Sequence, residues 1–200
     1  MVDLTSIKST FLDSSFICNV ISALGGSTDS TSLFCLKFLE QLNSSKSKLG
    51  ISAISAIEVM SIGSDEGTFV PDLLSALKSD QVEILPYDLE QGAATRKYGS
   101  KYINKNNLKS FISAFNDNFP DHKILRDHIS DDLKIAATCL TNGYEYLITT
   151  DHKTMYPIAS ELGVDVICCH FANCFNAKGT NIFTYEPSDA KNEYKKRMGL

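Results

Sequence analysis

The stretch Ser130–Met155, SDDLKIAATCLTNGYEYLITTDHKTM, decides the fold. It begins with an acidic turn and an apolar helix, which ends near Gly143 because glycine accepts the left-handed geometry found at many helix ends. The next run, Tyr144–Thr149, is aromatic and β-branched and too short for a helix, so it indicates an interior strand. Asp132 is then expected at a helix start and Asp151 just beyond a strand. Ligands of open parallel sheets bind near the carboxyl ends of strands, so this stretch predicts half of a site.

The composition is that of an ordinary globular protein. The chain has 200 residues, enough for one sizeable core, with 43% hydrophobic and 22% charged residues. It has no long apolar run and no signal-peptide pattern, so we expect a cytoplasmic protein without a membrane partner. The six cysteines lack the spacing of a disulfide framework and are expected to be free thiols. A net charge of −5 disfavours indiscriminate nucleic-acid binding but permits a local basic groove.

Short strands alternate with helices along the chain. The expected strands are Ile7–Leu12, Leu49–Ile54, Val82–Leu85, Tyr144–Thr149 and Val164–Cys168. The alternation predicts an α/β fold, a three-layer α/β/α sandwich around a central parallel sheet. We expect one domain over residues 1–170, with an insertion at about 104–127. Residues 171–200 are expected to be a C-terminal extension, either an edge strand at Ile182–Tyr185 with a basic helix or a mobile tail.

Four acidic residues lie where one edge of this sheet would collect them. Asp13 follows the first strand, and Glu58 lies three residues into a helix expected to begin at Ser55. Asp132 opens the apolar helix, and Asp151 follows the fourth strand. Four carboxylates in one place repel each other unless some hold a proton or divalent cations neutralise them. Oxygen ligands without nearby His or Cys favour Mg²⁺ or Mn²⁺, and such ions bind phosphodiesters and activate water.

Each acid also has a structural interpretation. Asp13 and Asp151 are placed to cap the helices that follow them. Glu58 is placed to complete a capping box with Ser55, and Asp131 or Asp132 to offset a helix dipole. The sequence leaves both interpretations open for each residue taken singly. Their shared position at one edge of the sheet favours a site.

Four segments together resemble the PIN-domain nucleases, especially the VapC-type toxins of toxin–antitoxin pairs. They are FLDSSFI, SAISAIEVM, DDLKIAA and YLITTDHKTM, and the resemblance runs from about Ser9 to Cys169. In that family an acid follows the first strand, and a second lies in an S/T-x-x-E segment. A third precedes an I-A-A helix, and a fourth follows a T-x-D strand end. The order of the acids is the same in this chain.

The resemblance implies a set of site residues. Metal-binding and catalytic roles fall on Asp13, Glu58, Asp132 and Asp151, and supporting hydroxyls on Ser14 and Thr149. It also implies one or two Mg²⁺ or Mn²⁺ ions, an RNA substrate, an antitoxin partner and a homodimer.

Two departures from the family pattern bear on these assignments. The family often has Asp-Thr-Asn after its first strand, whereas this chain has Asp13-Ser14-Ser15 and lacks the amide. Asp131 stands beside Asp132, and Asp132 is preferred as the ligand because it keeps the family's spacing to the I-A-A segment.

Two basic residues just before the third acid are the expected RNA-binding residues. They are Lys123 and Arg126, which stand nearer in sequence to Asp132 than the lysines that recur every fourth residue at Lys97, Lys101, Lys105 and Lys109. The function we expect is metal-dependent hydrolysis of RNA, with the toxin of a toxin–antitoxin pair as its most specific form. The alternatives are an RNA-processing nuclease unrelated to toxins and a catalytically silent PIN-like scaffold that binds RNA or protein.

Overall fold

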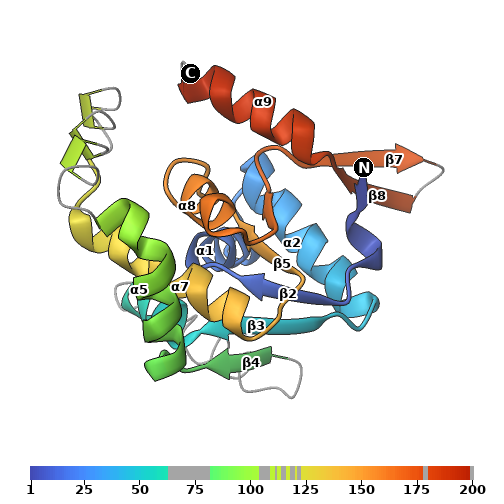
Figure 1. The fold of residues 1–200 in the computed structure, drawn as a ribbon. Coiled ribbons are helices and arrows are strands. Elements are labelled where there is room, and N and C mark those ends of the chain that lie inside the picture. The colour runs from blue at the N-terminus through green and yellow to red at the C-terminus, as the bar shows by residue number, and fades with distance from the viewer. Residues whose placement is uncertain are drawn as a thin grey trace.

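The computed structural model describes residues 1–62, 82–103, 109–110, 112–113, 116–117, 120, 123–177 and 180–198. Half of the expected insertion at 104–127 therefore lies outside the described residues. The described strands form one five-stranded and one three-stranded sheet (Figure 1).

The five-stranded sheet is the centre of the molecule. Its strands are β2 (Ser9–Leu12), β3 (Lys48–Ser52), β4 (Val82–Leu85), β5 (Tyr146–Thr149) and β6 (Val166–Cys168). They lie in the order β4-β3-β2-β5-β6, and every neighbouring pair is parallel. The predicted α/β class and parallel sheet are confirmed, with strands a little shorter than the sequence indicates.

Helices cover both faces of this sheet. They are α1 (Ser14–Leu24), α2 (Ser30–Ser44), α3 (Ala53–Ile62), α5 (Leu89–Ile103), α7 (Arg126–Thr141) and α8 (Met155–Leu162). Helix α1 packs on α2, whereas α5 and α8 both pack on α7. The chain moves from β2 to β4 in one direction and from β4 through β5 to β6 in the other. Right-handed connections then place the two groups of helices on opposite faces, which confirms the three layers.

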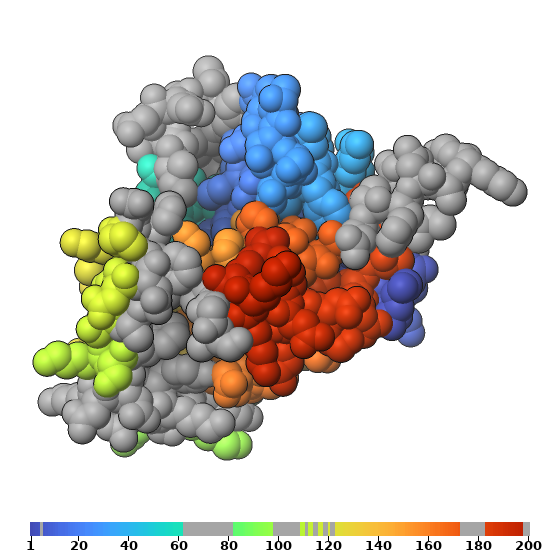
Figure 2. All heavy atoms as spheres, turned by 90° about the horizontal axis from the view of Figure 1, so that it is seen from above, coloured from blue at the N-terminus to red at the C-terminus, as the bar shows by residue number. Residues whose placement is uncertain are grey.

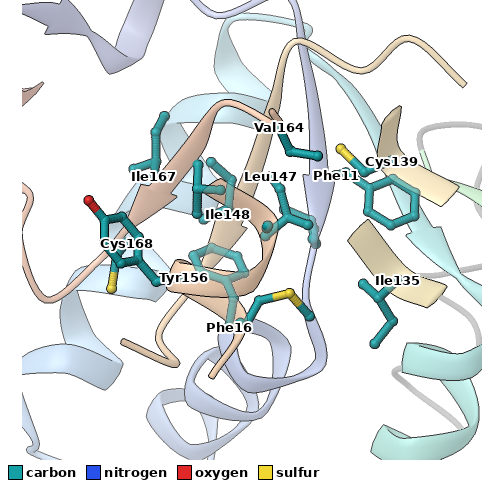
Figure 3. Close-up of a cluster of buried hydrophobic side chains, with 14 of the residues drawn as sticks. Phe11, Phe16, Ile135, Cys139, Leu147, Ile148, Tyr156, Val164, Ile167 and Cys168 are labelled. Carbon is teal, nitrogen blue, oxygen red and sulfur yellow. The ribbon is translucent and has the colours of Figure 1, made fainter. Parts of the chain in front are cut away.

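The core lies between the sheet and these helices, as Figure 3 shows. Phe11 pairs with Leu147 in register, and both are fully buried near Cys139 of α7. The next residue along β5, Ile148, points to the other face and pairs with Ile167 of β6. The central strands are thus apolar on both faces, as interior parallel strands are.

Two helices begin earlier than the sequence predicts. Helix α7 begins at Arg126, because Ile129 extends the buried stripe of Leu133 by one turn. Asp132 therefore lies six residues inside the helix, and its expected place at a helix start is wrong. Helix α3 begins at Ala53 rather than Ser55. The helix ends at Gly143 and Gly163 are as expected, with φ of 67° and 85°.

The second sheet joins the two ends of the described chain. It has the antiparallel order β1-β8-β7, formed by β1 (Val2–Asp3), β7 (Asn173–Ala177) and β8 (Thr180–Tyr185). A short 3-10 helix, Leu4–Ser6, follows β1. The strand predicted at Ile182–Tyr185 exists, but it belongs to this sheet and not to the edge of the central one.

The C-terminal extension packs against the body of the protein. Phe183 is 1% exposed, and its ring lies 5.2 Å from that of Phe34 and 5.7 Å from that of Phe38 in α2. The last helix, α9 (Pro187–Met198), lies beside α8 (Figure 2), where the Tyr194 ring is 5.4 Å from that of Tyr156. No described helix is both long and apolar enough to cross a membrane.

Candidate functional site

The candidate site lies at the carboxyl ends of β2 and β5. These neighbouring strands mark the point where the order of the sheet reverses, because β2 leads to β3 on one side and β5 leads to β6 on the other. Such switch points are where open α/β sheets bind ligands. Asp13 follows β2 and Asp151 comes two residues after β5, and the Asp13 backbone N–H donates to the Ile148 carbonyl at 3.0 Å.

Asp13 is held by hydroxyl groups rather than used as a helix cap. It stands before α1, but its side chain makes no capping bond. Its Oδ2 accepts hydrogen bonds from Ser15 Oγ at 2.5 Å and from Thr149 Oγ1 at 2.8 Å. Ser14 Oγ lies 3.4 Å from Oδ1, so Ser15 makes the stronger contact of the two serines. The capping interpretation of Asp13 is wrong.

Asp13 is 3% exposed. Its protonated form is therefore more favoured in the protein than it would be in water. Burial raises the pKa of Asp13 to about 6, against the lowering effect of the hydrogen bonds from Ser15 and Thr149. The negative charges of Asp151 and Glu58 raise it further.

Asp151 shapes the turn that leads into α8. Its Oδ1 accepts from the backbone N–H groups of Lys153 at 2.7 Å and Thr154 at 3.0 Å, and its Oδ2 accepts from Thr154 Oγ1 at 2.5 Å. The Asp151 N–H in turn donates to Thr149 Oγ1 at 2.9 Å. The N-cap of α8 is Thr154, so the capping interpretation of Asp151 is wrong, but these bonds fix its carboxylate at the edge of the site.

The two acids on helices differ, because each has a buried oxygen without a partner. Ser52 Oγ accepts from the Ser55 N–H at 2.8 Å, so Ser52 caps α3 and the expected capping box of Ser55 with Glu58 does not form. Within the described part of the chain, Glu58 Oε2 and Asp132 Oδ2 are buried and have no hydrogen-bond partner. A buried polar atom left unpaired costs about 1–3 kcal/mol.

The surroundings of Asp132 also favour its protonated form. Burial raises its pKa well above the ordinary value, and the charges of Asp151, Asp13 and Glu58 add to the increase, against a hydrogen bond from Thr154. The neighbouring Asp131 is different: it is 35% exposed and bonds to Lys134 Nζ at 2.6 Å.

A cavity of about 400 Å³ opens at this end of the sheet. Its walls are formed by Glu58, Lys123, Ile124, His128, Asp132, Asp151, Lys153 and Thr154. Lys123, one of the two expected RNA-binding residues, is therefore a lining residue of this cavity. Arg126 is exposed at the start of α7 and is not among these lining residues.

The four acids have the oxygen donors that a hard divalent cation prefers, but their side chains are not arranged around a common point. Among the described residues, no group of three or more His, Cys, Asp or Glu side chains is arranged to hold a metal ion. The unpaired oxygens of Glu58 and Asp132 are nevertheless buried carboxylate ligands whose side chains line one cavity. A donor set made only of carboxylates suits Mg²⁺ or Mn²⁺, so the residues fit the ion once their side chains converge on it.

Sequence reasoning missed the polar residues that support the acids. Ser15 Oγ also accepts from the Thr150 N–H at 3.1 Å, and Asn19 Nδ2 donates to Thr150 Oγ1 at 3.1 Å. Asn19 Oδ1 accepts from Ser32 Oγ at 3.0 Å, which joins α2 to the network. Asn19 follows Ser15 by four residues, so both lie on one face of α1, and this spacing was the available signal. His128 precedes Asp132 by the same spacing.

Comparisons with known proteins bear on the fold. No family model and no curated protein matches the sequence. One similar structure is VapBC2 from Rickettsia felis bound to a DNA fragment from their promoter, with 14% identity, a TM-score of 0.50, and coverage of 80% of this chain and 98% of that chain. Another is DNA-bound VapBC from Salmonella typhimurium, with 15% identity, a TM-score of 0.51 and the same coverage. At such identities the similarity concerns the fold, and the chain has a VapC-like PIN fold.

Proposed function

We propose that the protein is a metal-dependent endoribonuclease that hydrolyses phosphodiester bonds of RNA. The observation that carries the proposal is a pair of buried oxygens, on Glu58 and Asp132, that have no hydrogen-bond partner among the described residues and stand at a cavity that Asp151 also lines. Asp13, Glu58, Asp132 and Asp151 would hold one or two Mg²⁺ or Mn²⁺ ions. Bound there, such ions would lower the pKa of an attacking water and offset the negative charge of the phosphate.

The chain's own residues set up the rest of the chemistry. Ser15 and Thr149 fix the Asp13 carboxylate, and the turn at Lys153 and Thr154 fixes that of Asp151. The raised pKa values of Asp13 and Asp132 mean that protons compete with a cation for these groups. Lys123 in the cavity wall would bind a phosphate of the substrate.

The toxin of a toxin–antitoxin pair is the specific form of this proposal. It is supported by the fold, since both similar structures are VapBC complexes bound to DNA. The implied partners are an antitoxin that blocks the cavity and a second copy of the chain, and the implied location is the cytoplasm.

A second candidate function has one observation in its favour. The described acids are not arranged to hold a metal ion, as expected of a non-catalytic scaffold that binds RNA or protein. The unpaired oxygens at Glu58 and Asp132 count against it, because a scaffold gains nothing from their cost.

Cleavage of a mixed-sequence single-stranded RNA tests the proposal. Wild-type protein with Mg²⁺ or Mn²⁺ should cut the RNA, EDTA should stop it, and Asp13→Asn should slow it by roughly 100-fold or more while keeping its circular dichroism spectrum. Asp131→Asn, at the half-buried residue paired with Lys134, is the matched control and should cut normally. Equal rates for wild type and Asp13→Asn would refute the mechanism. RNA binding without cleavage by the wild type would support the scaffold.

A further inference from the structure

The cavity has two chemically different walls. Glu58, Asp132 and Asp151 form the acidic wall at the end of the sheet. The other charged or ionisable lining residues are Lys123, His128 and Lys153, all of which can donate hydrogen bonds. The acidic wall serves the cation in the proposed function, so the basic wall is where a substrate's phosphate and leaving group would lie.

His128 has a defined orientation at the edge of this cavity. It is in the first turn of α7 and precedes Asp132 by four residues, so the two side chains share one face of the helix. Its Nδ1 accepts the backbone N–H of Leu125 at 3.4 Å, just before the helix. This bond engages Nδ1 and leaves Nε2 as the nitrogen that can meet a ligand.

Hydrolysis of a phosphodiester also needs a proton for the oxygen that departs. The other possible proton donors that line the cavity are two lysines and Thr154, and ammonium and hydroxyl groups are ordinarily weaker acids than imidazolium. Imidazole is the side chain whose ordinary pKa lies near neutrality, which suits a general acid. His128 is the one imidazole among the described residues that line the cavity.

We propose that His128 donates a proton from Nε2 to the leaving oxygen during RNA cleavage. In this step the oxygen of a water forms a bond to phosphorus, the bond from phosphorus to the leaving oxygen breaks, and the water loses its proton to solvent. The imidazolium carries a proton on each nitrogen, so its Nδ1 no longer accepts the Leu125 N–H. Its Nε2 proton passes to the leaving oxygen, and the neutral imidazole regains a proton from solvent. The inference rests on the proposed function, because it assigns a role in that reaction.

His128→Gln separates this role from the structural one. Gln at the third position of a helix reaches back to the N–H before the helix, as His128 does, so the variant keeps the bond to Leu125. The Gln side chain has no acidic proton to transfer to the leaving oxygen. Equal melting temperatures of variant and wild type would show that the cap is intact. His170→Gln is the matched control, because His170 is an exposed histidine outside the lining of the cavity.

The test compares two single-stranded RNAs that have oxygen or sulfur as the leaving atom at the cleaved bond. Whether the leaving atom is the 3′ or the 5′ bridging atom is first determined with 3′-S and 5′-S analogues. A thiolate leaves without protonation. His128→Gln should therefore cut the oxygen substrate about 100-fold more slowly than wild type, and the sulfur substrate within about 3-fold of it. His170→Gln should match the wild type on both.

The outcomes distinguish the inference from the function it rests on. If His128→Gln slows both substrates equally, or slows neither, the inference is overturned and the nuclease function stands. If wild-type protein cuts neither substrate with Mg²⁺ or Mn²⁺, the nuclease function itself is overturned, and the inference with it.

Discussion

The acids at the strand ends and the acids on the helices are treated differently by the fold. Asp13 receives hydrogen bonds on its carboxylate from the hydroxyls of Ser15 and Thr149, and Asp151 receives them from backbone N–H groups and a hydroxyl of the turn that follows it. Glu58 and Asp132 each keep one buried oxygen without a partner in the described part of the chain. At Asp151 the difference is one of position, since a turn offers free N–H groups whereas a helix interior uses its own.

This difference separates carboxylates that the chain itself hydrogen-bonds from carboxylates that have an oxygen available for a ligand. The strand-end carboxylates are oriented before anything binds. The helix carboxylates carry the cost of burial without a matching gain, as groups kept for function do. No described residue compensates this cost, and a divalent cation has the chemistry to do so.

The largest expected effect tests whether hydrogen bonds offset burial at a strand end. The pKa of Asp13 is about 6 in the folded protein, above the ordinary 3.8. A raised pKa favours folding while the carboxyl is protonated, so stability is lost as the pH rises from about 4 through 6. Without divalent metal at pH 7.5 this loss is about 3 kcal/mol. Asp13→Asn removes it, and its melting temperature should be roughly 5–10 °C above that of wild type.

The pH dependence supplies the control for this prediction. At pH 4 the wild-type carboxyl carries its proton, so the two melting temperatures should approach each other. A variant less stable than wild type at every pH would mean that the bonds from Ser15 and Thr149 outweigh burial.

A slightly smaller effect tests whether the two acids on helices, Glu58 and Asp132, bind a divalent cation. Mn²⁺ at about 100 times its Kd should stabilise wild-type protein by about 2.7 kcal/mol, because it binds only the folded state. Asp132→Asn should lose most of the resulting rise in melting temperature, and Asp131→Asn should keep it. Equal losses in both variants would show a diffuse surface effect rather than a site.

The smallest effect separates the two serines beside Asp13. Ser15→Ala removes the donor at 2.5 Å and leaves the Thr150 N–H without its acceptor, so unfolding should become easier by about 1–2 kcal/mol. Ser14→Ala removes only the contact at 3.4 Å and should change the free energy of unfolding by less than about 0.5 kcal/mol. Urea unfolding measures both. If Ser14→Ala costs as much as Ser15→Ala, the hydroxyl role belongs to both residues.

The strand-end half of the site was predictable from local sequence. A short apolar run followed by Asp is a local signal, so Asp13 and Asp151 were placed correctly at the ends of β2 and β5. The central sheet followed from the alternation of such runs with helical patterns.

The helix half was harder, because helix starts depend on distant packing. Ile129 stands between polar residues, and only its burial in the core shows that α7 begins before the two aspartates. Both Ser52 and Ser55 have a hydroxyl that can cap α3, and the sequence alone does not show that Ser52 is the cap. The pairing of β1 with β8 depends on contacts across nearly the whole chain, for which no local pattern exists.

That pairing has a consequence for the order of folding. Val2 lies opposite Tyr185, so the contact closes a loop of roughly 180 residues, and its entropy cost is met only after nearer contacts have formed. The central sheet can assemble first, with the aromatic face of α2 that Phe183 later covers still open to water. In pulsed hydrogen exchange, amides of β2 and β5 should gain protection before those of β8. The candidate site would thus be built while the molecule is still an aggregation-prone intermediate, and the second sheet would be the last part to close.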